Sequence, residues 1–98
     1  MKTSELSGIA LDWAVAKCEF GDDMPAGFGS RSTDWSQAGP IIERESIELG
    51  RYADQWQAIF HGDCESIAQN AETPLIAAMR CYVASKLGDD VEIPEELT

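Results

Sequence analysis

The sequence predicts an α+β fold in which two main helices pack on a small, mostly antiparallel sheet. Three observations predict it. An apolar run over 74–87 has helix start and stop signals at its ends, a second apolar stretch over 4–18 has helical spacing, and residues 47–49 and 56–60 alternate with period two. The length of 98 residues fits a single domain, 1–98, with an acidic tail over 89–98 that we expect to fray.

We expect the first helix over residues 4–18. Thr3 or Ser4 can cap its N-terminus by accepting a hydrogen bond from a free first-turn N–H, and Glu5 suits the positive end of the helix dipole. Two stripes run along this segment: Leu6, Ala10, Trp13 and Lys17 form one, and Leu11, Val15 and Cys18 form the other. Two stripes predict a helix that is covered on more than one side.

Residues 20–40 show no period and hold four of the eight Gly and two of the four Pro, which predicts irregular chain. So long an irregular segment in a small domain is usually a functional or a mobile loop. Gly27–Ser32 lacks the third Gly of a dinucleotide motif and the Gly-Lys-Ser/Thr of a phosphate-binding loop, so it predicts a plain loop. We expect Pro40 to open a short helical turn through Arg44.

A hairpin is predicted next. Ile47 to Leu49 alternate, 50–54 is turn-like, and Trp56 to Phe60 alternate again, which predicts two short antiparallel strands with one covered face. Residues 61–72 are polar and predict a second loop with a helical turn near 66–69.

The helix over 74–87 has the strongest signals. Thr73 is the predicted cap, Pro74 the first helical residue and Gly88 the residue that ends it. Ten of the thirteen residues over 75–87 are apolar, so we expect a central helix or one covered by another subunit. Small residues predict a seam between the two helices, formed by Ala77, Cys81 and Ala84 against Ala10 and Ala14. In the tail, Val91 and Ile93 predict an edge strand.

The formal net charge is −11, from 18 acidic and 7 basic residues. A protein that binds a phosphate backbone needs clustered Lys and Arg, so we expect no direct binding of nucleic acid or of an anionic membrane surface. A solvated acidic surface is the first interpretation, and an acidic protein that occupies a basic site on a partner is the second. The apolar runs are too short for a membrane span of ~20 residues, and the N-terminus has no secretory signal pattern.

The three Cys are an odd number, which gives no disulfide framework and predicts a reducing cytoplasm. Cys18 and Cys81 lie in apolar segments and are expected to act as small hydrophobes. His61 and Cys64 have a metal-like spacing, but a zinc site needs about four ligands and a nucleophile pair needs a third, orienting group. We therefore expect no metal, no cofactor and no catalytic residue.

The candidate binding residues lie in the segment 32–45, STDWSQAGPIIERE. Asp34 or Ser36 can bond to nearby backbone N–H groups and fix the turn. One interpretation is that Trp35 plugs the edge of the core, because aromatic side chains bury large areas. The other is that Asp34, Trp35 and Arg44 line a recognition surface, since Trp and Arg are enriched in binding hot spots.

Three stretches together resemble a known family: LDWAVAKCE (11–19), STDWSQAGPIIERE (32–45) and TPLIAAMRCYVASKLGDD (73–90). They are similar to the small phage proteins of the NinX type, found in lambdoid phages and prophages. The resemblance implies a phage or prophage origin and the cytoplasm of the bacterial host, and it implies no reaction. Residues 20–31 and 59–72 show no match to the family pattern.

Function is therefore predicted to be that of a non-enzymatic phage accessory protein that binds a host or phage protein. Two alternatives stay open. One is an acidic decoy that mimics nucleic acid and blocks a basic host protein, and the other is a small ligand-binding protein or enzyme that uses the 20–40 loop. A homodimer also stays open, because the apolar last helix suits a dimer interface as well as a central core.

Overall fold

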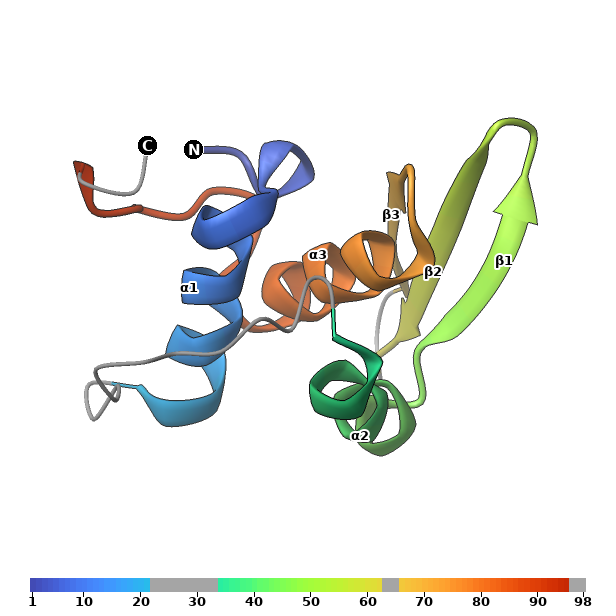
Figure 1. Ribbon diagram of the computed structural model, residues 1–98, viewed down its shortest axis with the longest axis horizontal. Coiled ribbons are helices and arrows are strands. Elements are labelled where there is room, and N and C mark those ends of the chain that lie inside the picture. The colour runs from blue at the N-terminus through green and yellow to red at the C-terminus, as the bar shows by residue number, and fades with distance from the viewer. Residues whose placement is uncertain (22–33, 63–65, 96–98) are drawn as a thin grey trace.

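The computed structural model describes residues 1–21, 34–62 and 66–95. Its elements in chain order are η1 (Thr3–Glu5), α1 (Gly8–Phe20), α2 (Trp35–Glu45), β1 (Glu48–Tyr52), β2 (Gln55–His61), β3 (Ser66–Ala71) and α3 (Pro74–Leu87). Helix α3 packs on a three-stranded antiparallel sheet of order β1-β2-β3, and α1 and α2 pack against α3, so the predicted α+β class is confirmed (Figure 1). Among the described residues, no helix is long and apolar enough to cross a membrane.

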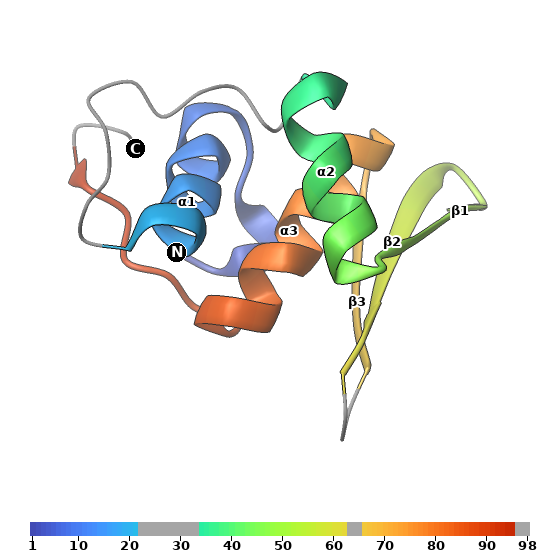
Figure 2. The same ribbon diagram turned by 90° about the horizontal axis from the view of Figure 1, so that it is seen from below.

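Helix α3 is the centre of the fold. It packs against η1, α1, α2 and all three strands, and Figures 1 and 2 place α1 on one side of it and the sheet on the other. Its predicted bounds are confirmed: Oγ1 of Thr73 accepts a hydrogen bond from the N–H of Ile76 at 3.1 Å, and Gly88 ends the helix with φ +85°, which favours glycine. Most of its apolar residues are buried by the rest of the chain, as expected of a central helix.

Two residues of the small-residue stripe of α3, Cys81 and Ala84, lie beside strand β3. The thiol of Cys81 donates to the carbonyl of Ile67 in β3 at 3.3 Å, and Ala84 lines a cleft with the same strand. Helices α1 and α3 are in contact as predicted, but Cys81 and Ala84 also lie beside β3. Tyr82 of α3 reaches α1, and its hydroxyl donates to Glu19.

Helix α1 begins later than predicted, at Gly8, and Ser7 is its N-cap. The predicted cap Thr3 lies in η1 instead, fully buried, where its hydroxyl donates to the carbonyl of Gly88 at 2.6 Å. A hydroxyl engaged in this tertiary contact is not available to cap α1. The prediction that this helix is covered on more than one side is confirmed. Its buried residues are Ala10, Leu11, Asp12, Ala14, Val15 and Ala16.

The C-terminal tail pairs with the N-terminus. The N–H of Val91 donates to the carbonyl of Met1 at 2.8 Å, the N–H of Thr3 donates to that of Asp89 at 2.8 Å, and Lys2 and Asp90 form a single bridge. The predicted edge strand from Val91 and Ile93 is therefore wrong, because buried Val91 is held by residues far from the sheet.

Helix α2 is longer than the predicted turn and begins five residues earlier, at Trp35. Asp34 caps it, and Ala38 and Ile41 turn into the core. Pro40 lies inside the helix, where it has no N–H for the carbonyl of Ser36, but Ser36 is exposed and the missing bond faces solvent. The helix ends at Ser46, which has the left-handed φ of 54°.

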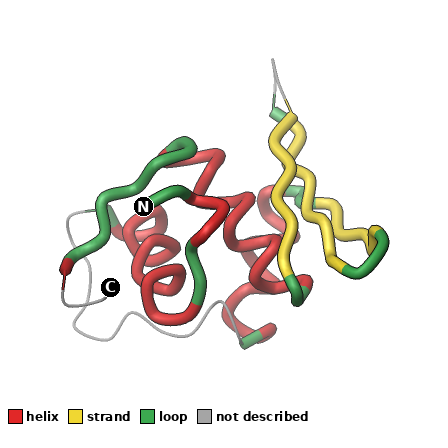
Figure 3. Tube along the Cα trace, turned by 90° about the horizontal axis from the view of Figure 1, so that it is seen from above, coloured by secondary structure: helices red, strands yellow, loops and turns green. Residues whose placement is uncertain are grey.

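The predicted hairpin is confirmed, although β1 continues through Gly50 to Tyr52, which we expected to be a turn. Tyr52 pairs with Gln55 across a two-residue loop, and Ala53 in that loop has φ +56°. Figure 3 shows the strands standing beside the helices, and α3 contacts all three strands.

The predicted loop over 61–72 is wrong, because Ser66–Ala71 forms the edge strand β3. Ile67, Gln69 and Ala71 alternate as the less exposed residues of this strand. The polar Gln69 at the middle inward position hides the period-two pattern from the sequence.

Candidate functional site

Two of the three candidate residues, Asp34 and Trp35, are neighbours at the start of α2. Oδ1 of Asp34 accepts hydrogen bonds from the backbone N–H of Ser36 at 2.9 Å and from its hydroxyl at 2.6 Å, and Oδ2 accepts one from Nε2 of Gln37 at 3.1 Å. These bonds, that of the Ser36 hydroxyl foremost, lower the pKa of the Asp34 carboxyl. The prediction that Asp34 fixes this turn is confirmed.

Trp35 is 52% exposed at the first position of α2. The interpretation that it plugs the edge of the core is therefore wrong. The helix enters the core through Ala38 and Ile41, and Trp35 stays accessible on a capped and anchored turn. A large aromatic side chain on a fixed backbone is available to a partner with little further ordering.

The third candidate, Arg44, does not lie beside Trp35. It follows Trp35 by nine residues in the same helix, which is two and a half turns, or ~13.5 Å along the axis and on the opposite flank. Its guanidinium turns toward α1 and α3 instead. Asp34, Trp35 and Arg44 thus do not line one surface.

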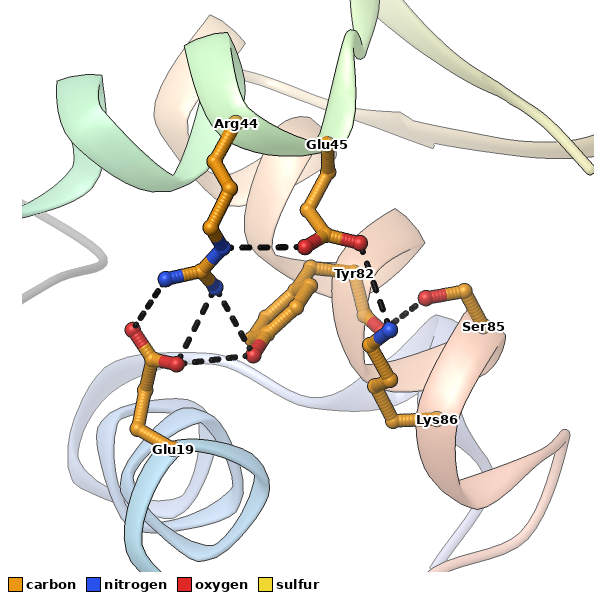
Figure 4. A network of polar contacts seen from close by, with 6 residues as sticks. All are labelled: Glu19, Arg44, Glu45, Tyr82, Ser85 and Lys86. Carbon is orange, nitrogen blue, oxygen red and sulfur yellow. Dashed lines mark hydrogen bonds and ion pairs between the residues drawn. The ribbon is translucent and has the colours of Figure 1, made fainter.

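Arg44 belongs to a polar junction of the three helices, which consists of Glu19, Arg44, Glu45, Tyr82, Ser85 and Lys86 (Figure 4). Nη2 of Arg44 lies 3.1 Å from Oε2 of Glu19 and donates to the Tyr82 hydroxyl at 3.2 Å. The Tyr82 hydroxyl donates to the same Glu19 oxygen at 2.9 Å. The junction therefore ties α1, α2 and α3 together around one phenol.

A second set of contacts extends the junction along α3. The carboxylate of Glu45 accepts from Nε of Arg44 at 3.0 Å and pairs with Nζ of Lys86 at 3.3 Å. Both cations lie near the ring of Tyr82, Arg44 at 5.7 Å and Lys86 at 5.9 Å from its centroid. The Ser85 hydroxyl donates to the Tyr82 carbonyl at 2.6 Å within α3.

The protonation states of the groups in the junction favour a structural role for them over a catalytic one. Burial, assisted by the hydrogen bond to Glu19, raises the pKa of the Tyr82 phenol. Hydrogen bonds to Glu45 and then Glu19 raise the pKa of Arg44. Burial opposes ionisation of Glu45, but hydrogen bonds from Arg44 and Lys86 outweigh it and lower its pKa. At neutral pH the phenol is neutral and the charges are paired, which suits a contact that holds the three helices together rather than a general acid or base.

The family model described as Bacteriophage P22, NinX matches residues 28–86, which is more than half of the chain. The chain belongs to this NinX family. The matched range contains α2, the whole sheet and α3 up to Lys86, whereas α1 lies before it. No match was found among curated proteins.

The NinX match also runs through 59–72, where we expected none, so His61 and Cys64 lie inside the family region. His61 is an exposed residue at the end of β2, and its Nε2 lies 3.3 Å from Oε1 of Glu48 in β1. Cys64 lies outside the described residues, as do residues 27–32 of the predicted plain loop. In the part of the chain that the structure describes, no three His, Cys, Asp or Glu residues gather as a metal site would require.

The two described thiols of this NinX-family chain behave as the predicted small hydrophobes. Cys81 is buried in the core, and Cys18 packs against that core. Burial, with a smaller contribution from Glu19, raises the pKa of the Cys18 thiol to about 12, and burial raises that of Cys81 to about 11. At neutral pH both groups stay protonated and are poor nucleophiles.

Sequence reasoning missed Glu19, Glu45, Tyr82 and Lys86. Glu19 and Tyr82 are 63 residues apart, and Glu19 and Arg44 are 25 apart, so no local spacing connects them. One signal was available: Arg44 sits in the last turn of a helix that also carries buried positions, where a long cation often reaches a neighbouring element.

Proposed function

We propose that this NinX-family protein is a non-enzymatic protein-binding module of a phage, which acts on a host or phage protein inside the bacterial cell. The contact surface is the first turn of α2, with Trp35 as its anchor and Asp34 as the residue that holds the turn. The observation that carries the proposal is the exposure of Trp35, 52%, on a capped helix whose inner face is anchored in the core.

The physical argument is one of preorganisation. A Trp side chain offers 150–250 Å² in all, and covering ~100 Å² of exposed indole stabilises a complex by about 2.5 kcal/mol. The cap at Asp34 fixes the turn before a partner arrives, so little conformational entropy is lost on binding. Tryptophan is also among the residues that most often dominate binding energy at interfaces.

Arg44 takes no part in this surface, because Glu19 and Glu45 occupy its guanidinium. The proposed contact is therefore mainly apolar, and its affinity changes little with salt. An acidic decoy of a basic protein would behave differently. Its binding would rest on the net charge of −11, would weaken steeply with salt and would not depend on Trp35.

The test is capture of partners from phage-infected cells by tagged protein, followed by affinity measurement with the purified partner. Trp35→Ala is compared with Ile9→Ala, a matched control in α1 that also removes an exposed apolar side chain, 54% exposed. We expect Trp35→Ala to weaken the Kd on the order of 10- to 100-fold at unchanged melting temperature, and Ile9→Ala to leave it unchanged.

The salt dependence of the wild-type complex is measured between ~50 and ~500 mM NaCl, where screening of exposed charges changes strongly. Equal binding by Trp35→Ala and wild type, or the absence of any reproducible partner, would overturn the proposal. A steep loss of affinity with salt together with insensitivity to Trp35→Ala would favour the decoy.

A further inference from the structure

Strand β1 (Glu48–Tyr52) has an open edge. It pairs with β2 on one side, and Figures 1 and 2 show no described element along its other side. In a two-residue hairpin the residues that flank the loop, Tyr52 and Gln55, exchange both backbone hydrogen bonds, and the pattern alternates along the strand. Leu49 and Arg51 therefore present their N–H and C=O groups to the open edge.

Gly50 lies between Leu49 and Arg51 in β1, and neither its backbone conformation nor its described neighbours require a glycine at this position. Its φ is not in the left-handed region, and a Cβ built on it would meet no atom within 4 Å. Glycine weakens the interior of a strand, and it often marks a place where another backbone comes close. Among the described residues, no backbone approaches Gly50 along the open edge of β1.

We propose that β1 pairs in antiparallel register with β1 of a second copy, about a two-fold axis at Gly50, so that two sheets join into one of six strands. Leu49 then faces Arg51 of the second copy and exchanges two backbone hydrogen bonds with it, and the symmetric pair adds two more. Gly50 faces its own equivalent at the axis. This inference is independent of the proposed function, because Trp35 lies on α2.

Charge and shape favour this register. Only Glu48 and Arg51 among the five residues of β1 are charged, so β1 is neutral in a chain of net charge −11. On the outer face, Glu48 lies opposite Tyr52 of the second copy, whose phenol can donate to the carboxylate. The Tyr52 ring, 72% exposed in one copy, lies diagonally over Gly50 of the other, an arrangement in which an aromatic ring covers a strand glycine.

The other registers that satisfy the edge hydrogen bonds are poorer. A two-fold axis at Arg51 would place two guanidinium groups opposite each other, and like charges in that position are destabilising. An axis at Leu49 would leave Tyr52 without an opposite residue in β1. The axis at Gly50 pairs all five residues and opposes no like charges.

The dimer is expected to be weak and to tighten with salt. Pairing of five residues falls short of the ~1,600 Å² of a standard stable interface. Two chains that each carry −11 repel one another, and the Debye length falls from ~10 Å at 0.1 M salt to ~3 Å at 1 M. Added NaCl therefore removes more repulsion than attraction.

The experiment is sedimentation equilibrium of the full chain from about 5 to about 500 μM protein, at ~50 and ~500 mM NaCl. Arg51→Pro removes one edge N–H, and Arg51→Ala, the matched control, removes the same side chain and keeps the N–H. We expect wild type and Arg51→Ala to dimerise more at high concentration and high salt, and Arg51→Pro to stay monomeric. Trp35→Ala must dimerise like wild type.

Amide hydrogen exchange on the wild-type chain keeps the inference testable if Arg51→Pro fails to fold. We expect the amides of Leu49 and Arg51 to exchange several-fold more slowly as protein concentration rises, while that of Gly50, already bonded to β2, changes little. A chain that is monomeric under every condition overturns the inference. So does a dimer in which the Leu49 and Arg51 amides are unchanged, or one that Arg51→Pro leaves intact.

Discussion

Replacing Tyr82 with Phe removes one hydroxyl and keeps the ring, so it tests the polar junction without opening a cavity. That hydroxyl donates to Oε2 of Glu19 at 2.9 Å and accepts from Nη2 of Arg44 at 3.2 Å. Tyr82 is 2% exposed, so water has little room to replace the lost group. The substitution therefore separates the hydrogen bonds of the junction from the packing of the ring.

We expect Tyr82→Phe to lower the free energy of unfolding by about 1.5 kcal/mol. A hydrogen bond to a charged group contributes about 1.5–3 kcal/mol, and the lower end applies because Glu19 and Arg44 keep their own contact at 3.1 Å. In a domain of this size ~1 kcal/mol shifts the Tm by roughly 4–8 °C, so the Tm is expected to fall by about 6–12 °C.

Urea unfolding followed by circular dichroism measures the free energy, and a thermal melt measures the Tm. Both are done at low micromolar concentration, so that the proposed β1 pairing is kept to a minimum. Tyr52→Phe is the matched control, since it removes a hydroxyl from a residue that is 72% exposed and should stay within about 0.5 kcal/mol of wild type. Equal losses in Tyr82→Phe and Tyr52→Phe would show that the junction hydroxyl adds no stability, and the reasoning would be wrong.

Three more predictions concern stability. Ala77→Leu places a larger side chain at a fully buried position of α3 and is expected to cost roughly 1–3 kcal/mol by overpacking; an unchanged Tm would contradict the tight contact there. Thr73→Ala removes the acceptor for the Ile76 N–H and should cost about 1 kcal/mol in urea unfolding, with Thr73→Ser close to wild type. The Cys18 thiol has a folded pKa raised from 9.0 to about 12, so its stabilising contribution is complete below pH 9 and is lost as pH rises toward 12. Unfolding free energy measured against pH should therefore fall above pH 9, and less steeply in Cys18→Ala; identical pH profiles would refute this assignment.

Local signals were enough for α3 and for the hairpin. Thr73, Pro74 and Gly88 mark the ends of α3 by interactions within a few residues, so its bounds could be predicted from the sequence. The start of α2 was missed because Pro40 suits a first helical position, and that preference outweighed the cap at Asp34. Strand β3 was missed because it depends on pairing with β2, and Gln69 interrupts its apolar alternation.

The candidate site was predictable in part, because local signals in the sequence also mark its first two residues. Asp34 and Trp35 stand out as a capping residue next to an aromatic in a polar segment, and the structure keeps them together. Arg44 was grouped with them by sequence proximity, but helix geometry turns it to the opposite flank. Its partners Glu19 and Tyr82 come from helices that only tertiary packing brings near.

The junction around Tyr82 affects how truncated variants of this protein should be designed. The family match begins at residue 28, yet Glu19, one of the two carboxylates of the junction, belongs to helix α1, which precedes that residue. A fragment cut at residue 28 would strip α1 from the flank of α3 and leave Arg44 with one fewer counter-ion. We therefore expect such a fragment to be less stable than the full chain, and deletion studies should keep α1 attached.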